Sequence, residues 1–124
     1  MFKKILSNGI TLVLDKRPYE SLTIEATVKV GSNNETKNIF GISHFIEHML
    51  FDGTKTRDAR QIAMEIERIG GEINALTSNE RTSYHIKVLR KHFDKALEII
   101  SDVIQNPKFN EESIEKERKV ILDE

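Results

Sequence analysis

The chain has 124 residues, which suits one domain with a core of its own. Hydrophobic residues make up 38% and charged residues 31% of the chain, a balance that favours a globular protein over a disordered or membrane-embedded one. With 19 basic and 20 acidic residues the formal net charge is −1, so we expect neither nucleic acid nor an anionic membrane as a partner. The absence of cysteine excludes disulfides and thiolate metal sites.

The N-terminus begins with two lysines and apolar residues, as a signal peptide does, but the apolar run stops at Ser7-Asn8-Gly9. No stretch approaches the roughly 18 apolar residues of a membrane span, so we expect a cytoplasmic location. Asn8-Gly9 separates two β-prone runs, residues 2–6 and 10–15, and predicts a hairpin. Residues 21–30 alternate and predict a half-buried strand, whose inward side chains would be Leu22, Ile24, Ala26, Val28 and Val30.

After a loop at residues 31–39, helices and strands alternate irregularly along the chain. Periodicity predicts helices at residues 41–51, from 56 or 57 to 69, from 93 to about 105, and from an Asn110 cap to the end. Gly70-Gly71 is expected to stop the second helix. The third should bury Phe93, Ala96, Leu97, Ile100 and Ile104. With strands at 72–77 and 82–89, the pattern predicts an α+β fold, an antiparallel (mixed) sheet with helices packed on one face.

The most informative segment is His44-Phe45-Ile46-Glu47-His48. Residues four apart lie on the same face of a helix, so His44 and His48 can bind one zinc ion together. Glu47 projects toward the same face and is too close to His48 to be a ready third ligand. It is placed to act as general base on a water that the metal acidifies. This is the inverted form of the His-Glu-x-x-His peptidase motif.

An ordinary interpretation also exists, because five residues can match by chance and a helical His–Glu pair can be a surface ion pair. The flanking residues Phe45, Ile46, Met49, Leu50 and Phe51 are strongly apolar, which predicts a largely buried helix. Ionisable side chains in a buried helix are costly unless they are paired or bind a metal. The context therefore favours a metal site.

A catalytic zinc usually has three protein ligands, and spacing leaves the third one open. Glu117 and Glu124 are seven residues apart, on one face of the predicted last helix. Residues 111–119 are also typical of a solvated charged surface. His85 and His92 are the other candidates, each more typical of a polar surface or capping residue.

Several segments together resemble the N-terminal domain of the pitrilysin, insulin-degrading enzyme and mitochondrial processing peptidase family. The resemblance covers essentially the whole chain. It is carried by Gly31-Ser32, residues 41–51, Asp52-Gly53-Thr54, Gly70-Gly71, Asn74-Ala75-Leu76-Thr77-Ser78, Tyr84 and residues 117–124.

The resemblance implies that one zinc ion per chain is bound by His44, His48 and Glu124, which lies about 75 residues past the second histidine. It implies that Glu47 is the catalytic base and that Glu117 supports the ligands. Asn74, Ala75 and Thr77 match a strand whose backbone pairs with an extended substrate. The implied reaction is zinc-dependent endopeptidase hydrolysis of short or unfolded peptides.

Members of this family have two related halves that close on the peptide like a clamshell, whereas this chain ends at the implied third ligand. We therefore expect residues 1–124 to be a single, truncated N-terminal catalytic domain that needs a complementary C-terminal half. Self-association through uncovered apolar faces is also expected. The alternative is a non-catalytic peptide- or subunit-binding fragment, which the intact motif disfavours. A purely structural zinc site would normally have four ligands.

Overall fold

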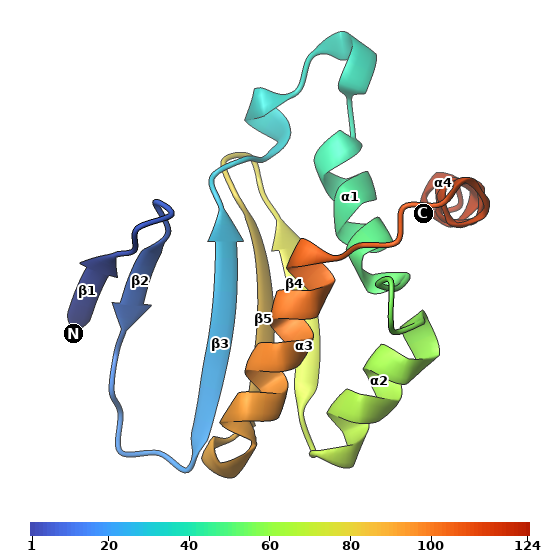
Figure 1. Ribbon diagram of the computed structural model, residues 1–124. Helices are drawn as coiled ribbons and strands as arrows, with labels where there is room; N and C mark the ends of the chain where they lie inside the picture. The colour runs from blue at the N-terminus through green and yellow to red at the C-terminus, as the bar shows by residue number, and fades with distance from the viewer.

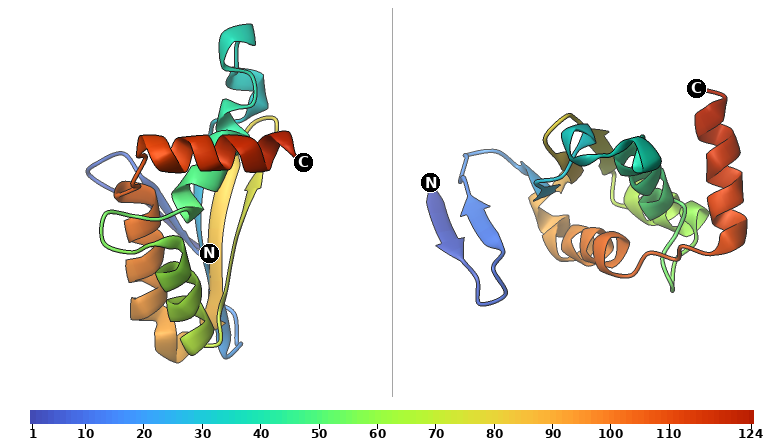
Figure 2. Two further views of the ribbon diagram at one scale, coloured as in Figure 1. Left: turned by 90° about the vertical axis from the view of Figure 1, so that its right-hand side faces the viewer. Right: turned by 90° about the horizontal axis from the view of Figure 1, so that it is seen from above.

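The computed structural model describes all of residues 1–124, and its α+β fold confirms the predicted class. A three-stranded antiparallel sheet lies at its centre, in the order β3 (Ser21–Val28), β5 (Thr82–Leu89), β4 (Glu72–Thr77). The helices are α1 (Ile42–Phe51), α2 (Ala59–Arg68), α3 (Phe93–Gln105) and α4 (Glu111–Leu122), with short 3₁₀ turns at Ser32–Asn34, Lys37–Ile39 and Arg90–His92. The first three helices cover one face of the sheet, and α4 lies against the outer side of α1 (Figures 1 and 2).

The predicted hairpin is present as β1 (Phe2–Ile5) and β2 (Thr11–Leu14). Gly9 adopts a φ of +89° in its turn, and the Asn8 side chain accepts a hydrogen bond from the backbone of Ile10. The hairpin forms a sheet of its own beside β3 and does not join the central sheet (Figure 1). All its strand residues are exposed. None of the helices combines the length and the apolar composition that a membrane span requires.

The core lies between the central strand and α3. Tyr84, Ile86 and Val88 of β5 point inward and are at most 4% exposed, as expected for a strand with a neighbour on each side. The other buried members of this core come from α1, α2 and α3: Leu50, Ile62, Ile66, Ala96, Ile99, Ile100 and Val103. This packing fixes the sheet relative to the helices that carry the candidate site.

Two predicted apolar faces differ from the structure. Leu22, Ile24 and Ala26 of β3 are half-buried as predicted, but the strand ends at Val28, and Val28 and Val30 are exposed. In α3 the buried face contains Ile99 and Val103, whereas Phe93 and Leu97 are over 40% exposed. The apolar stripe of this helix is wider than one face, so periodicity alone does not tell which edge meets the sheet.

The second helix begins two to three residues later than predicted. Asp58 and Gln61 form a capping box, in which each side chain accepts a 2.8 Å hydrogen bond from the other residue's backbone. At the other end, Gly70 has a φ of +65°, and the amides of Gly70 and Gly71 donate to the carbonyls of Glu67 and Ile66. This Schellman ending confirms the predicted glycine stop and turns the chain directly into β4.

Candidate metal centre

The N-terminus of α1, the helix that carries the motif, is capped by a residue that precedes the helix in the chain. It begins after Gly41, which has a φ of +84° and no side chain to cap the helix. The carboxylate of Glu35 accepts hydrogen bonds from the backbone amides of Gly41, at 2.7 Å, and Ser43, at 3.0 Å. These hydrogen bonds hold the pKa of Glu35 below its ordinary value, and the bond from Gly41 has the larger effect. The negative charge lies at the N-terminus of α1, where the helix dipole favours it.

Three of the predicted ligands converge. The Nε2 atoms of His44 and His48 are 3.0 Å apart. The Glu124 carboxylate lies 3.7 Å from each of these nitrogens, with one oxygen toward each histidine. All three ligand atoms lie within 4.8 Å of one another. Ligand atoms bound tetrahedrally to one zinc ion at 2.0–2.1 Å are about 3.3 Å apart, so the set fits zinc with small adjustments.

Glu117 lies behind the histidines. Its carboxylate is 3.2 Å from Nδ1 of His48, and the two side chains are only 12% and 22% exposed. With its proton on Nδ1, His48 donates to Glu117 and turns the lone pair of Nε2 toward His44 and Glu124. This carboxylate–histidine arrangement is the usual support of a zinc ligand. A further ion pair, between Lys116 and Asp52 at 3.2 Å, joins α4 to the end of α1.

Glu47 lies between two hollows at the free edge of β4. One, of about 270 Å³, is lined by His48, Phe51 and Asn74 among others. The second, of about 400 Å³, is lined by His44, Phe40 and Leu76 among others. Glu47 borders both.

The remaining predicted residues take different places. Asn74, Ala75 and Thr77 lie on β4, whose outer edge has no neighbouring strand. His85 lies on β5 opposite Glu25 and Asn74, and His92 precedes α3 without making a side-chain cap. Neither histidine belongs to the candidate metal-binding group of His44, His48 and Glu124. Both alternatives for the third ligand therefore lie away from the site.

Two features of the site were missed by sequence reasoning. The cap by Glu35 has a weak signal, since a glycine before a helix leaves the first amides without a local partner. The second is a hydrogen bond from the Thr77 hydroxyl to the Glu47 carboxylate. No pattern signals it, because 30 positions separate the two residues and only the packing of α1 on β4 brings them together.

Comparisons with known proteins identify the family of this chain. Residues 11–124 match the family model described as Insulinase (Peptidase family M16). The chain belongs to this insulinase family. It is 51% identical over 120 residues to an uncharacterised zinc protease of Rickettsia felis, covering 96% of this chain and 29% of the relative. It is 42% identical to the mitochondrial-processing peptidase subunit beta of Lentinula edodes, covering 96% of this chain and 26% of the relative.

A solved structure shows the same fold. The crystal structure of a protease from Helicobacter pylori superposes on 98% of this chain with a TM-score of 0.94, at 31% sequence identity. This chain covers 30% of that protein. It thus spans less than a third of the length of the relatives described here, and the resemblance to the insulinase-type peptidases is confirmed.

Proposed function

We propose that residues 1–124 form the N-terminal catalytic module of a zinc-dependent endopeptidase. The observation that carries this proposal is the convergence of His44, His48 and Glu124 beside Glu47. Three ligands leave a fourth position for water or substrate, as in catalytic rather than structural zinc sites. The names of the zinc-protease relatives also support it. A cytoplasmic location stays a prediction.

In this proposal each residue of the site has a separate role. His44, His48 and Glu124 would hold the metal, and Glu117 keeps the His48 ring oriented. A bound zinc ion would polarise the scissile carbonyl and acidify the attacking water. Glu47 takes the proton of that water and delivers it to the leaving amine.

The free edge of β4 supports an extended peptide as the substrate. A peptide laid along this edge would pair with the backbone of Asn74, Ala75 and Thr77 and place side chains in the hollows on either side of Glu47. Only a segment without secondary structure of its own can add to a sheet in this way. The expected substrates are therefore short or unfolded peptides.

We further propose that turnover needs a complementary C-terminal half. The two hollows are open, and Glu124, two residues beyond the end of α4, is 52% exposed, so no segment of residues 1–124 covers a bound peptide. The Lentinula relative is named as a subunit, which supports partnering. The same name supports the second candidate, a non-catalytic subunit- or peptide-binding module. That module needs no general base, so Glu47 discriminates between the two.

The test combines zinc content with peptide cleavage. Purified protein is loaded with zinc, and a mixture of unfolded peptides is followed by mass spectrometry, with and without the C-terminal part of the Rickettsia felis relative. The parent should hold about one zinc per chain and His48→Ala none. A fully loaded His48→Ala protein would show that the ligand set is wrong.

The matched variant Glu47→Gln removes the base and keeps the size of the side chain. It should retain zinc and lose cleavage in the complemented enzyme. Continued turnover by Glu47→Gln would refute the general-base role. A zinc-loaded parent that binds peptides but never cleaves them, even when complemented, would favour the binding module. Equal rates with and without the C-terminal part would refute the need for a second half.

A further inference from the structure

The general base of the proposed reaction has one hydrogen-bond partner in the protein. Thr77 donates from Oγ1 to Oε2 of Glu47, and no other side chain or amide is bonded to this carboxylate. The partner lies at the end of β4, on the face toward α1, because Ile73, Ala75 and Thr77 are the half-buried side chains of this strand. The second carboxylate oxygen, Oε1, carries no protein hydrogen bond.

Thr77 is itself held in place by the turn that follows it. Residues 78–81 join β4 to β5, and Ser78 closes this turn by bonding to Arg81 through both its amide and its hydroxyl. The amides of Ser32 and Asn33 donate to the carbonyls of Ser78 and Asn79, at 3.1 and 2.8 Å. The turn is thereby fixed to the segment that precedes α1.

That same segment caps the helix of the base. Two residues beyond Asn33, Glu35 accepts from the amides of Gly41 and Ser43. A closed ring therefore runs from Glu47 through Thr77, the 78–81 turn and the 31–35 segment back to the start of α1. Gly31 permits the closest approach in this ring, since a Cβ there would lie 2.2 Å from the carbonyl oxygen of Ser78. Such a ring limits how far Glu47 and Thr77 can move apart.

We propose that Thr77 is a positioning residue for Glu47, whose side-chain hydroxyl fixes Oε2 so that Oε1 faces the reacting water. This role rests on the proposed peptidase function and goes beyond the backbone role that the family resemblance implies for the strand. A free glutamate side chain samples several rotamers, and a bonded one keeps its unbonded oxygen in one direction. Proton transfer needs that direction, because misplacement by about 1 Å can cost 100-fold in rate.

The experiment compares Thr77→Val with Thr77→Ser in the zinc-loaded, complemented enzyme. Valine keeps the shape and removes the hydroxyl, and serine keeps the hydroxyl. Thr77→Val should lower kcat roughly 10- to 100-fold with KM changed less than about twofold, and Thr77→Ser should restore kcat to within about threefold. Thr23→Val removes an exposed hydroxyl from β3 and serves as the matched control. A rise in KM with kcat unchanged would mean that Thr77 holds substrate, and would overturn the proposal.

A second measurement needs no activity. In protein labelled with ¹³C-glutamate, the carboxyl resonance of Glu47 should shift in Thr77→Val and return in Thr77→Ser, since this resonance reports hydrogen bonding. An unmoved resonance overturns the proposal whether or not the chain cleaves peptides. Cleavage that persists in Glu47→Gln would instead remove the proposed role of Glu47 as the base, while the resonance still tests the hydrogen bond. Zinc content and thermal midpoint should stay at parent values in both variants.

Discussion

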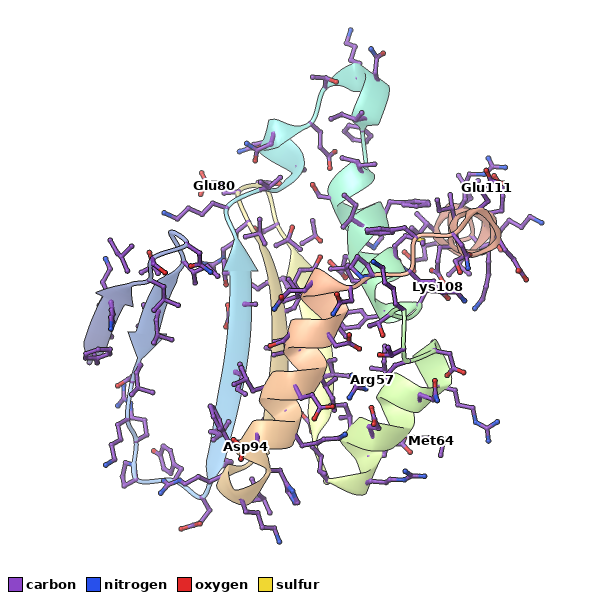
Figure 3. All side chains as sticks on the ribbon, viewed as in Figure 1. Arg57, Met64, Glu80, Asp94, Lys108 and Glu111 are labelled. Carbon is purple, nitrogen blue, oxygen red and sulfur yellow. The ribbon has the colours of Figure 1, made fainter.

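Arg57 is the centre of an ion-pair network that fixes the turn after α1. Its side chain is 13% exposed and lies between α2 and α3 (Figure 3). The guanidinium bonds to Glu65, Glu98 and Asp102, the last at 2.8 Å. Asp102 also accepts from the hydroxyl of Thr54, which follows α1, at 2.7 Å. Replacing Arg57 by methionine keeps much of the apolar stem and removes the charge.

The expected loss follows from the burial of the partners. Asp102 and Glu65 are 11% and 24% exposed, whereas Glu98 is 57% exposed and contributes little. Removing Arg57 leaves Asp102 without a charged partner, whereas Glu65 keeps its ion pair with Lys95 at 3.1 Å. Because these carboxylates retain some contact with water, we expect about 3 kcal/mol, the lower end of the usual range. For a chain of this length that lowers the thermal midpoint by about 12 °C.

The loss should depend on pH. Burial alone would raise the pKa of Asp102, but hydrogen bonds from Thr54, Arg57 and Asn106 together hold it below its ordinary value. A carboxyl whose pKa is lowered by folding stabilises the protein above its unfolded-state pKa, and this contribution disappears as the pH falls through the folded-state pKa. The difference between parent and Arg57→Met should therefore be full at pH 7 and shrink below about pH 4.

The assay is urea unfolding followed by far-ultraviolet circular dichroism at both pH values. Arg17→Met is the matched control: Arg17 makes an ion pair of the same 2.8 Å length with Asp15, but the two side chains are 68% and 43% exposed. It should cost under about 0.5 kcal/mol. Equal losses for the two variants, or a loss at Arg57 that does not shrink in acid, would refute the reasoning.

Three further outcomes are expected. Glu117→Gln should weaken zinc binding about 10- to 100-fold in a competition titration, because His48 loses a charged partner; unchanged affinity would contradict the orienting role. Gly31→Ala should destabilise the fold by about 3 kcal/mol, since the added methyl meets backbone rather than a flexible side chain, and parent-like urea unfolding would argue against the close approach. Asn110→Ala removes the 2.8 Å cap on Ser113 and should cost about 1 kcal/mol of α4 stability, seen as faster amide exchange confined to that helix.

The parts of the site that the sequence predicted are those set by local geometry. His44, Glu47 and His48 owe their common face to helical spacing, and the Asn110 cap is likewise a contact over three residues. Glu124 is different. Spacing left four candidates, and only the family resemblance favoured Glu124, because its distance from the histidines depends on how α4 packs against α1.

Long-range polar contacts could not be predicted. The partners of Arg57 lie on two helices. No sequence pattern distinguishes these three carboxylates from the other acidic residues of the chain, which has 20 in all. The α3 face illustrates the same limit for apolar residues. The sequence did not predict the burial of Ile99, because Phe93 and Leu97 fit helical periodicity equally well. The packing of α3 against the sheet determines that Ile99 is buried and that Phe93 and Leu97 are exposed.

The candidate site thus joins a firmly packed part to a lightly packed one. Glu47 and the histidines lie on α1, whose Met49 and Leu50 are buried and whose start is held by Glu35. The α4 helix buries only Ser113 completely, and polar contacts from Lys116, Glu117 and Glu124 connect it to α1. Apolar burial therefore fixes Glu47 and the two histidines, while α4 is held by these polar contacts and by the half-buried Ile114 and Ile121. A metal ion bound by residues of both segments would connect α4 to α1 more strongly than these contacts do. Metal binding and the docking of α4 on α1 are therefore expected to be coupled.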